Sequence, residues 1–175
     1  MSSENPSSAV NQQERLSFEK WIVGFVDGEG CFSISVVRNA SMSHGWQVQH
    51  EFAVVQSATS GNVLELIKSH YGCGSIVKQK RKDSRRSDLW RFSVKNRKEL
   101  QETIIPFFIA NPLLTSKQND FVLFCEAVKC LHSSIPYPQK LHTCAAIAEK
   151  MNRKKKSRFL ESSEAIRQLT CATTS

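Results

Sequence analysis

The stretch WIVGFVDGEG, residues 21–30, carries the pattern that decides the fold. Its apolar residues recur at helical spacing, but Gly24 and Gly28 interrupt them and two acids, Asp27 and Glu29, stand near the end. A glycine inside a helix costs roughly 0.5–1 kcal/mol relative to alanine, so this pair requires a reason. Residues four apart lie on one helix face, where two glycines allow a second helix to approach closely.

If the second helix belongs to another copy of the chain, a two-fold dimer results. We expect its interface to include Gly24, Asp27 and Gly28, with Asp27 as a structural acid that caps the helix end across the dimer rather than a catalytic one. The two copies of Glu29 would then lie near the axis, where their charges repel unless divalent cations separate them. Oxygen ligands suit Mg²⁺, and two such ions can stabilise the attacking and leaving oxygens in phosphodiester hydrolysis.

Two β-hairpins are predicted from residues that alternate between apolar and polar. The strands of the first are expected at 31–37 and 46–55, and those of the second at 74–80 and 88–94. The first hairpin turns one face outward, with Ser33, Ser35, Val37, Asn39, Gln47, Gln49 and Glu51.

Helical spacing completes the order of elements. The helices are expected at 18–28 with Ser17 as N-cap, at 60–72, at 96–108 limited by Pro106, from 115 to 132 with a Thr115-x-x-Gln118 capping box, and at 139–152. This order predicts an α+β fold, αββαββα, with a four-stranded antiparallel sheet covered by helices on one face. Residues 1–16 are expected to form a disordered leader, 17–152 the folded domain and 153–175 a basic tail.

Positive charge is concentrated along the second hairpin. Lys and Arg number 24 against 16 Asp and Glu, which gives a net charge of +8 and suggests a polyanionic partner. A two-stranded ribbon fits the major groove of DNA, where Gln can pair with adenine and Glu can accept from cytosine N4. On this hairpin we expect guanine and phosphate contacts from Lys78, Lys80, Lys82, Arg85, Arg86, Asp88 and Arg91. The Lys154–Lys156 run either touches the DNA backbone or is simply solvated.

The six cysteines show no zinc-ligand spacing. We interpret them as reduced, mostly buried thiols of an intracellular protein rather than as a disulfide framework. No apolar stretch approaches the roughly 20 residues of a membrane span.

The signature helix, followed at once by CFSISV, resembles the LAGLIDADG homing endonucleases. The two hairpins, YGCGSI before the third strand and PLLTSKQNDF before the long helix match the order of that family, over about residues 17–132. One copy of the motif is present, and family members of this kind and length are homodimers. The resemblance implies an αββαββα endonuclease domain with a DNA-binding sheet.

The resemblance also implies roles for individual residues. Glu29 would be the metal-binding acid, where Asp is common in the family, and the carbonyl of Gly28 a second ligand for Mg²⁺. Gln56 would orient water, although a plain polar strand end is the alternative. The family's basic residue falls by strict spacing on Thr115, which the capping box explains. Lys117 is therefore the candidate, with a solvated first-turn lysine as the alternative.

The leading hypothesis is a homodimeric, Mg²⁺-dependent endonuclease that cuts a long pseudo-palindromic DNA site and promotes intron mobility. The resemblance implies that it acts in an organelle, a chloroplast or a mitochondrion. Two alternatives stay open. One is an RNA maturase that binds intron RNA and assists splicing, and the other is a DNA-binding regulator that does not cleave.

Overall fold

The computed structural model describes residues 6–80, 87–151 and 156–162. Helix α1 (Pro6–Glu29) leads directly into strand β1 (Gly30–Arg38), which pairs with β2 (Trp46–Ser57). A short η1 (Ala58–Ser60) and α2 (Asn62–Tyr71) precede the second hairpin, β3 (Ser75–Gln79) and β4 (Leu89–Val94). The remaining elements are α3 (Arg97–Glu99), η2 (Leu100–Ile104), α4 (Ile105–Ala110), α5 (Lys117–His132) and α6 (Tyr137–Met151).

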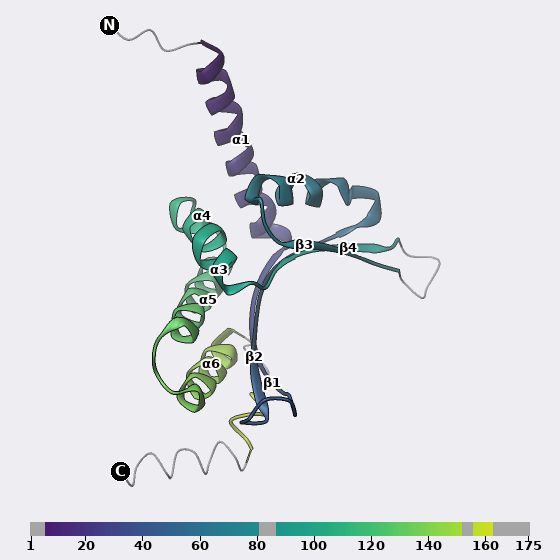
Figure 1. Ribbon diagram of the computed structural model, residues 1–175. Helices are drawn as coiled ribbons and strands as arrows, with labels where there is room; N and C mark the ends of the chain where they lie inside the picture. The colour runs from purple at the N-terminus through teal and green to yellow at the C-terminus, as the bar shows by residue number, and fades with distance from the viewer. Residues whose placement is uncertain (1–5, 81–86, 152–155, 163–175) are drawn as a thin grey trace, which may run out of the picture.

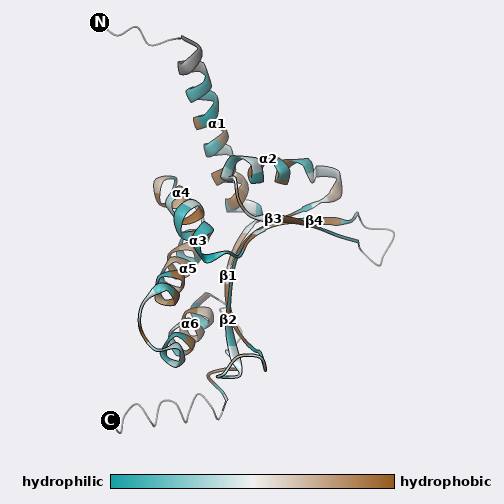
Figure 2. Cartoon of the chain, in the orientation of Figure 1, coloured by the Kyte–Doolittle hydropathy of each residue, from teal (hydrophilic) through white to brown (hydrophobic). Residues whose placement is uncertain are grey.

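The four strands form one antiparallel sheet in the order β1-β2-β4-β3, which confirms the predicted α+β class. Helices α3 to α6 lie on one side of β1 and β2, and α2 lies along β3 and β4 (Figure 1). The N-terminal part of α1 extends beyond the body of the fold and is mostly hydrophilic (Figure 2). One face of the sheet is therefore covered and the other is left open.

Aromatic side chains fill the space between the sheet and the helices. Phe32 on β1 stacks on Phe52 of β2, with ring centroids 5.0 Å apart. Phe108 of α4 and Phe121 and Phe124 of α5 pack against Phe32 at 5.2–5.4 Å. Burying a side chain of this size stabilises the fold by roughly 1.5–3 kcal/mol. This core fixes β1, and with it the end of α1, against α5.

Helix α1 begins well before the predicted 18–28, at Pro6. Residues 6–16, which we expected to be part of a disordered leader, are helical, and Ser17 lies inside the helix rather than at its N-cap. The segment is rich in good helix formers, and a proline in the first turn needs no N–H. Residues 1–5 of the expected leader lie outside the described ranges, and so does most of the expected basic tail.

Pro106 does not limit its helix as predicted, because α4 continues to Ala110. The turn before it is a π-helix, in which the N–H of Ile105 donates to the carbonyl of Leu100. This wider turn places Pro106 at the start of α4, where its missing N–H and fixed φ are tolerated.

The cysteines are less buried than predicted. All five in the described ranges are free thiols, but among them only Cys144 is buried, and Cys31 is exposed on the sheet. Burial raises the pKa of the Cys144 thiol to about 12. Cys171 lies outside the described ranges. Where the chain is described, no helix is long and apolar enough to cross a membrane.

Candidate active site and open sheet face

The candidate site is built on the junction between α1 and β1. Glu29 is the last residue of α1 and is exposed, and Gly28 before it is exposed too. A Cβ at Gly30 would lie 2.5 Å from Val26 Cγ1 and 2.8 Å from Val26 O, so only glycine fits where the strand begins. The strand therefore starts without a loop, and Glu29 is held between a packed helix and a packed sheet.

Asp27 ties this junction to the segment before α5. Its Oδ2 accepts a hydrogen bond from the Leu114 N–H at 2.7 Å, and its Oδ1 accepts from the Thr115 hydroxyl at 2.7 Å and the Thr115 N–H at 3.3 Å. Partial burial would raise the pKa of Asp27, but these hydrogen bonds and the charge of Lys117 lower it below its ordinary value. These contacts give Asp27 a structural place within its own chain, while its expected part in the dimer interface stays a prediction.

The same contacts replace the predicted capping box. Thr115 donates to Asp27 and accepts from the Lys117 N–H at 3.2 Å, while Gln118 Oε1 accepts from the Leu113 N–H at 3.1 Å. The reciprocal Thr115–Gln118 pairing is therefore wrong, because a carboxylate from α1 takes the donors of Thr115. Helix α5 begins at Lys117 instead.

Lys117 lies at the C-terminal end of α1. Its Nζ donates a hydrogen bond to the main-chain oxygen of Val26 at 2.8 Å. The last carbonyls of a helix have no partner within it and carry partial negative charge, so a cation there is stabilising. The side chain is half-buried, so the alternative of a freely solvated lysine does not describe its position.

Gln56 lies at the same end of the sheet as Glu29. The β1–β2 ladder begins with Gly30 opposite Val54, and Gln56 is two residues further along β2, opposite Trp90 of β4. It is half-buried near the end of its strand. The fold thus gathers Glu29, Gln56 and Lys117 from three elements at one end of the sheet, while their chemical roles stay predictions.

Few protein ligands for a cation are available here. Within the described ranges, no group of three His, Cys, Asp or Glu side chains is arranged to hold a metal ion. Both oxygens of Asp27 are occupied, which leaves the Glu29 carboxylate and the backbone carbonyl of Gly28. Mg²⁺ commonly takes one or two carboxylates and completes its shell with water and substrate phosphate, so this oxygen donor set fits it.

One face of α1 is open beside this site. A Cβ built on Gly24 or Gly28 would meet no atom of the described residues within 4 Å, apart from those of its own stretch of helix. Leu114, held by Asp27 through its backbone, is 91% exposed. These residues are accessible to a second copy of the chain, but the dimer stays a prediction.

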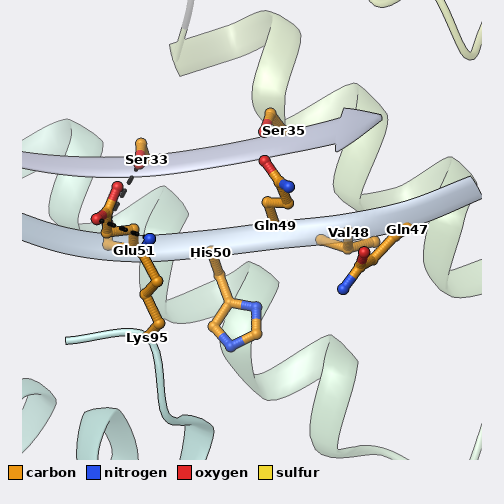
Figure 3. A pocket seen from close by; sticks show the side chains of 8 residues that line it. All are labelled: Ser33, Ser35, Gln47, Val48, Gln49, His50, Glu51 and Lys95. Carbon is orange, nitrogen blue, oxygen red and sulfur yellow. Dashed lines mark hydrogen bonds and ion pairs between the residues drawn. The ribbon is translucent and has the colours of Figure 1, made fainter. Parts of the chain in front are cut away.

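The first hairpin presents its polar side chains as predicted. Directly opposed residues of an antiparallel pair share a face, and the register opposes Ser33 to Glu51, Ser35 to Gln49 and Val37 to Gln47. Their partly exposed side chains lie on the open face, where all of them except Val37 line a hollow of about 330 Å³ together with Lys95 (Figure 3). Asn39, just beyond β1, donates to Gln47 Oε1 at 2.7 Å and so braces the end of this row.

The second hairpin differs from the prediction. The register opposes Lys78 to Trp90, and Arg91 to Val77 and Val55, so Lys78 and Arg91 lie on opposite faces. Lys78 Nζ lies 3.9 Å from the centre of the Trp90 ring, and that ring packs against Gly61 just before α2, so both lie on the side of the sheet that α2 covers. Its placement with Arg91 on one DNA-facing surface is therefore wrong. The sequence misled because Ile76 and Val77 are both apolar, so alternation did not fix which face is buried.

The other predicted contacts of this hairpin are not all placed. Lys80 follows the end of β3 and is exposed, and Asp88 precedes β4 and is half-buried. Lys82, Arg85 and Arg86 lie outside the described ranges, as do Lys154 and Lys155. Lys156 is described and exposed, beside the outer edge of β1.

Glu51 is paired within the chain, which the sequence did not predict. Its carboxylate accepts from Arg91 Nη2 at 2.5 Å and from Arg91 Nε at 3.2 Å, and Lys95 Nζ lies 3.6 Å away. Burial would raise the pKa of Glu51, but the hydrogen bonds and charges of Arg91 and Lys95 lower it. Lys95 was missed because it comes one residue after β4, although the β2–β4 register carries it toward Glu51.

Comparison with known proteins agrees with this geometry. Residues 22–128 match the model of a family described as LAGLIDADG endonuclease. The chain is 34% identical over 120 residues to the "Probable intron-encoded endonuclease Cox1-I1b" of Schizosaccharomyces pombe, covering 69% of this chain and 29% of that protein. It is 29% identical over 142 residues to the "DNA endonuclease I-CvuI" of Chlorella vulgaris, covering 81% of each. The chain thus spans less than a third of the S. pombe relative.

Solved structures show the same fold. The homing endonuclease I-TnaI superposes with a TM-score of 0.68 at 31% identity, covering 86% of this chain and 96% of that one. I-SmaMI, solved bound to cleaved DNA, superposes with a TM-score of 0.66 at 29% identity, covering 78% of this chain and 44% of its own. With its fold, its motif and most of its length in agreement, the chain belongs to the LAGLIDADG endonuclease family.

Proposed function

We propose that this chain is a site-specific DNA endonuclease that uses divalent metal ions to hydrolyse phosphodiester bonds. The observation that carries the proposal is the position of Glu29, an exposed acid at the helix end from which the open polar sheet directly continues. DNA lying along the sheet would pass beside this acid. The names of the relatives, which include DNA endonucleases and one bound to cleaved DNA, support the same activity.

Each residue near the junction has a distinct part in this proposal. Glu29 and the carbonyl of Gly28 would hold Mg²⁺, which supplies charge stabilisation and an activated water to phosphodiester hydrolysis. Gln56 would orient the attacking water through its side-chain amide. Lys117, fixed by its hydrogen bond to Val26 O, would place positive charge near the phosphate as negative charge develops.

The active form in this proposal is a homodimer that binds a long pseudo-palindromic target. The open face of α1 at Gly24 and Gly28 supports it, because among the described residues nothing beyond the local helix lies within 4 Å of a Cβ placed at either glycine. The match to about half of I-SmaMI also supports it, since that longer protein has room for a second unit. Two sheets related by a dyad would then read the two halves of the target.

The biological role we propose is intron homing. Relatives in fungi carry names that include "intron-encoded endonuclease", and one is named for an ND4 intron. By the same inference the protein acts in the organelle that carries its intron.

A cleavage selection on a library of randomised double-stranded DNA tests the proposal. The folded protein is incubated with Mg²⁺ or with Ca²⁺, and the cut ends are sequenced. Cuts at one long, near-palindromic sequence, dependent on Mg²⁺, are expected. Enrichment of bound DNA without any cut would contradict the nuclease and favour a DNA-binding regulator, whereas preferential binding of intron RNA would favour a maturase.

A further inference from the structure

An ion pair on the open sheet face holds one arginine in a fixed orientation. Arg91 donates to Glu51 through Nε and through Nη2, so one edge of its planar guanidinium faces the carboxylate. Two roughly parallel hydrogen bonds of this kind restrict both the direction and the plane of the group. Figure 3 shows Glu51 on β2 beside Ser33 of β1, with Lys95 approaching its carboxylate.

The three residues of this ion-pair cluster differ in how much of each side chain is exposed. The side chain of Glu51 is 16% exposed, that of Arg91 33% and that of Lys95 70%. The carboxylate is thus the more enclosed partner, while a third of the Arg91 side chain reaches solvent. Much of the conformational freedom of the Arg91 side chain is lost on folding, before any ligand binds.

The outer edge of the guanidinium remains available to a ligand. An arginine has five N–H donors in a rigid fork, and Glu51 takes the Nε donor and one of the Nη2 donors. Among the residues that the structure describes, both hydrogen bonds of Arg91 go to Glu51. The edge formed by Nη1 and Nη2 therefore points away from the carboxylate, and this edge matches the O6 and N7 acceptors of guanine in the major groove.

Arg91 also stands in the interior of the sheet. It lies on β4, with Val55 of β2 on one side and Val77 of β3 on the other. When a sheet enters a groove, its central side chains face the base edges, whereas side chains at the rim face the phosphates. A guanidinium at the centre of the sheet, with its Nη1–Nη2 edge already oriented, is therefore suited to hydrogen-bond a base edge.

We propose that Arg91 reads a guanine in each half of the DNA target and that Glu51 is its positioning residue. This inference rests on the proposed function of the open face. It also reverses the expected role of Glu51, whose oxygens are committed to Arg91 and Lys95 rather than offered to cytosine. Lys95, far more exposed, would contact the phosphate backbone.

Selection of bound sequences from randomised DNA, with Ca²⁺ to prevent cleavage, tests this proposal. The variants are Arg91→Lys, which keeps the charge but loses the planar fork, Arg91→Gln, which also removes the charge, and Glu51→Gln, which removes the charge of the positioning residue. Lys78→Ala is the matched control, because it removes a cation of the same hairpin from the opposite face. Each variant is first checked for wild-type secondary structure and cooperative unfolding.

We expect the wild type to select a guanine at one symmetric position of its site. A good bidentate contact discriminates by about 1–3 kcal/mol, so both Arg91 variants should lose roughly 5- to 150-fold of preference at that position and keep the others. Glu51→Gln should weaken the same position by a smaller factor. Lys78→Ala should leave every preference unchanged.

Three results would overturn the proposal. If both Arg91 variants bind DNA more weakly but keep the wild-type base preference at every position, Arg91 contacts a phosphate. The proposed function would then remain intact. Loss of a cytosine preference at another position in Glu51→Gln would mean that Glu51 reads a base itself. A wild type that selects no sequence at all would contradict the proposed function, and this inference with it.

Discussion

Lys117 on α5 donates a hydrogen bond from its ammonium group to the main-chain oxygen of Val26 on α1, over 2.8 Å. The contact joins the two helices close to Glu29, where α1 ends and β1 begins. It combines a stabilising role at a helix C-terminus with the placement of a cation beside the candidate metal ligands. The two roles can be separated by experiment.

Replacing Lys117 with methionine should affect activity far more than stability. Loss of this half-buried cation at the C-terminal end of α1 should lower the free energy of unfolding by about 0.5 kcal/mol. Loss of a group that acts on the reacting phosphate should lower the cleavage rate on the order of 100-fold. Single-turnover cleavage and urea unfolding measure the two effects. Lys129→Met, in the exposed last turn of the same helix, is the control, and equal cleavage by both variants would exclude a catalytic role for Lys117.

Asp27→Asn should lower the free energy of unfolding at neutral pH. It should also make that free energy depend less on pH in the acidic range. The folded-state pKa of Asp27 is lowered, so its stabilisation is present above the ordinary carboxyl pKa and is lost as pH falls through the folded value. Asparagine keeps one acceptor oxygen but loses the one that binds the Leu114 N–H, which should cost about 1 kcal/mol.

Urea unfolding of both proteins at pH 7 and near pH 3 would measure this difference. We expect the wild type to lose more stability on acidification than Asp27→Asn does. Glu65→Gln, on the exposed face of α2, serves as the control substitution. Identical pH profiles for wild type and Asp27→Asn would show that the contacts of Asp27 carry no net free energy.

Gly24, inside the motif, and Gly30, at its end, should respond differently to substitution by a larger residue. Gly30→Ala should destabilise the fold, because its Cβ would overlap the backbone of Val26. A Cβ at Gly24 would meet no atom of the described chain within 4 Å beyond its own stretch of helix, and leucine improves helix propensity, so the folded protomer should be at least as stable. If Gly24 lies in the dimer interface, the leucine should nonetheless shift sedimentation toward monomer. A Gly24→Leu protein that remains a dimer would rule out that interface.

Much of the fold was predictable because its strands alternate clearly. In the first hairpin, Phe32, Ile34 and Val36 alternate with polar or small residues, and the register that follows puts Ser33, Gln49 and Glu51 on the open face as expected. The signature motif likewise predicted where α1 ends and Glu29 begins the junction. These features depend on local periodicity, which a sequence displays directly.

Other features depend on contacts between distant segments. Nothing near Thr115 in the sequence indicates that its hydroxyl would donate a hydrogen bond to Asp27. Nothing near Glu51 indicates that it would pair with Arg91, forty residues later. Pro106 was expected to limit a helix because a π-turn cannot be predicted from propensity alone. The faces of β3 were uncertain because two apolar residues adjoin, and only pairing with β4 assigns Lys78 to the covered side.

The most direct test of the proposed nuclease is Glu29→Gln, assayed on the target that the wild type selects. The amide keeps the size of the side chain but removes the charge that would hold Mg²⁺. We predict that the variant binds this DNA as the wild type does in Ca²⁺-free buffer, and makes no cut when Mg²⁺ is added. Cleavage at the wild-type rate would contradict the assignment of Glu29, and with it the active site proposed at the end of α1.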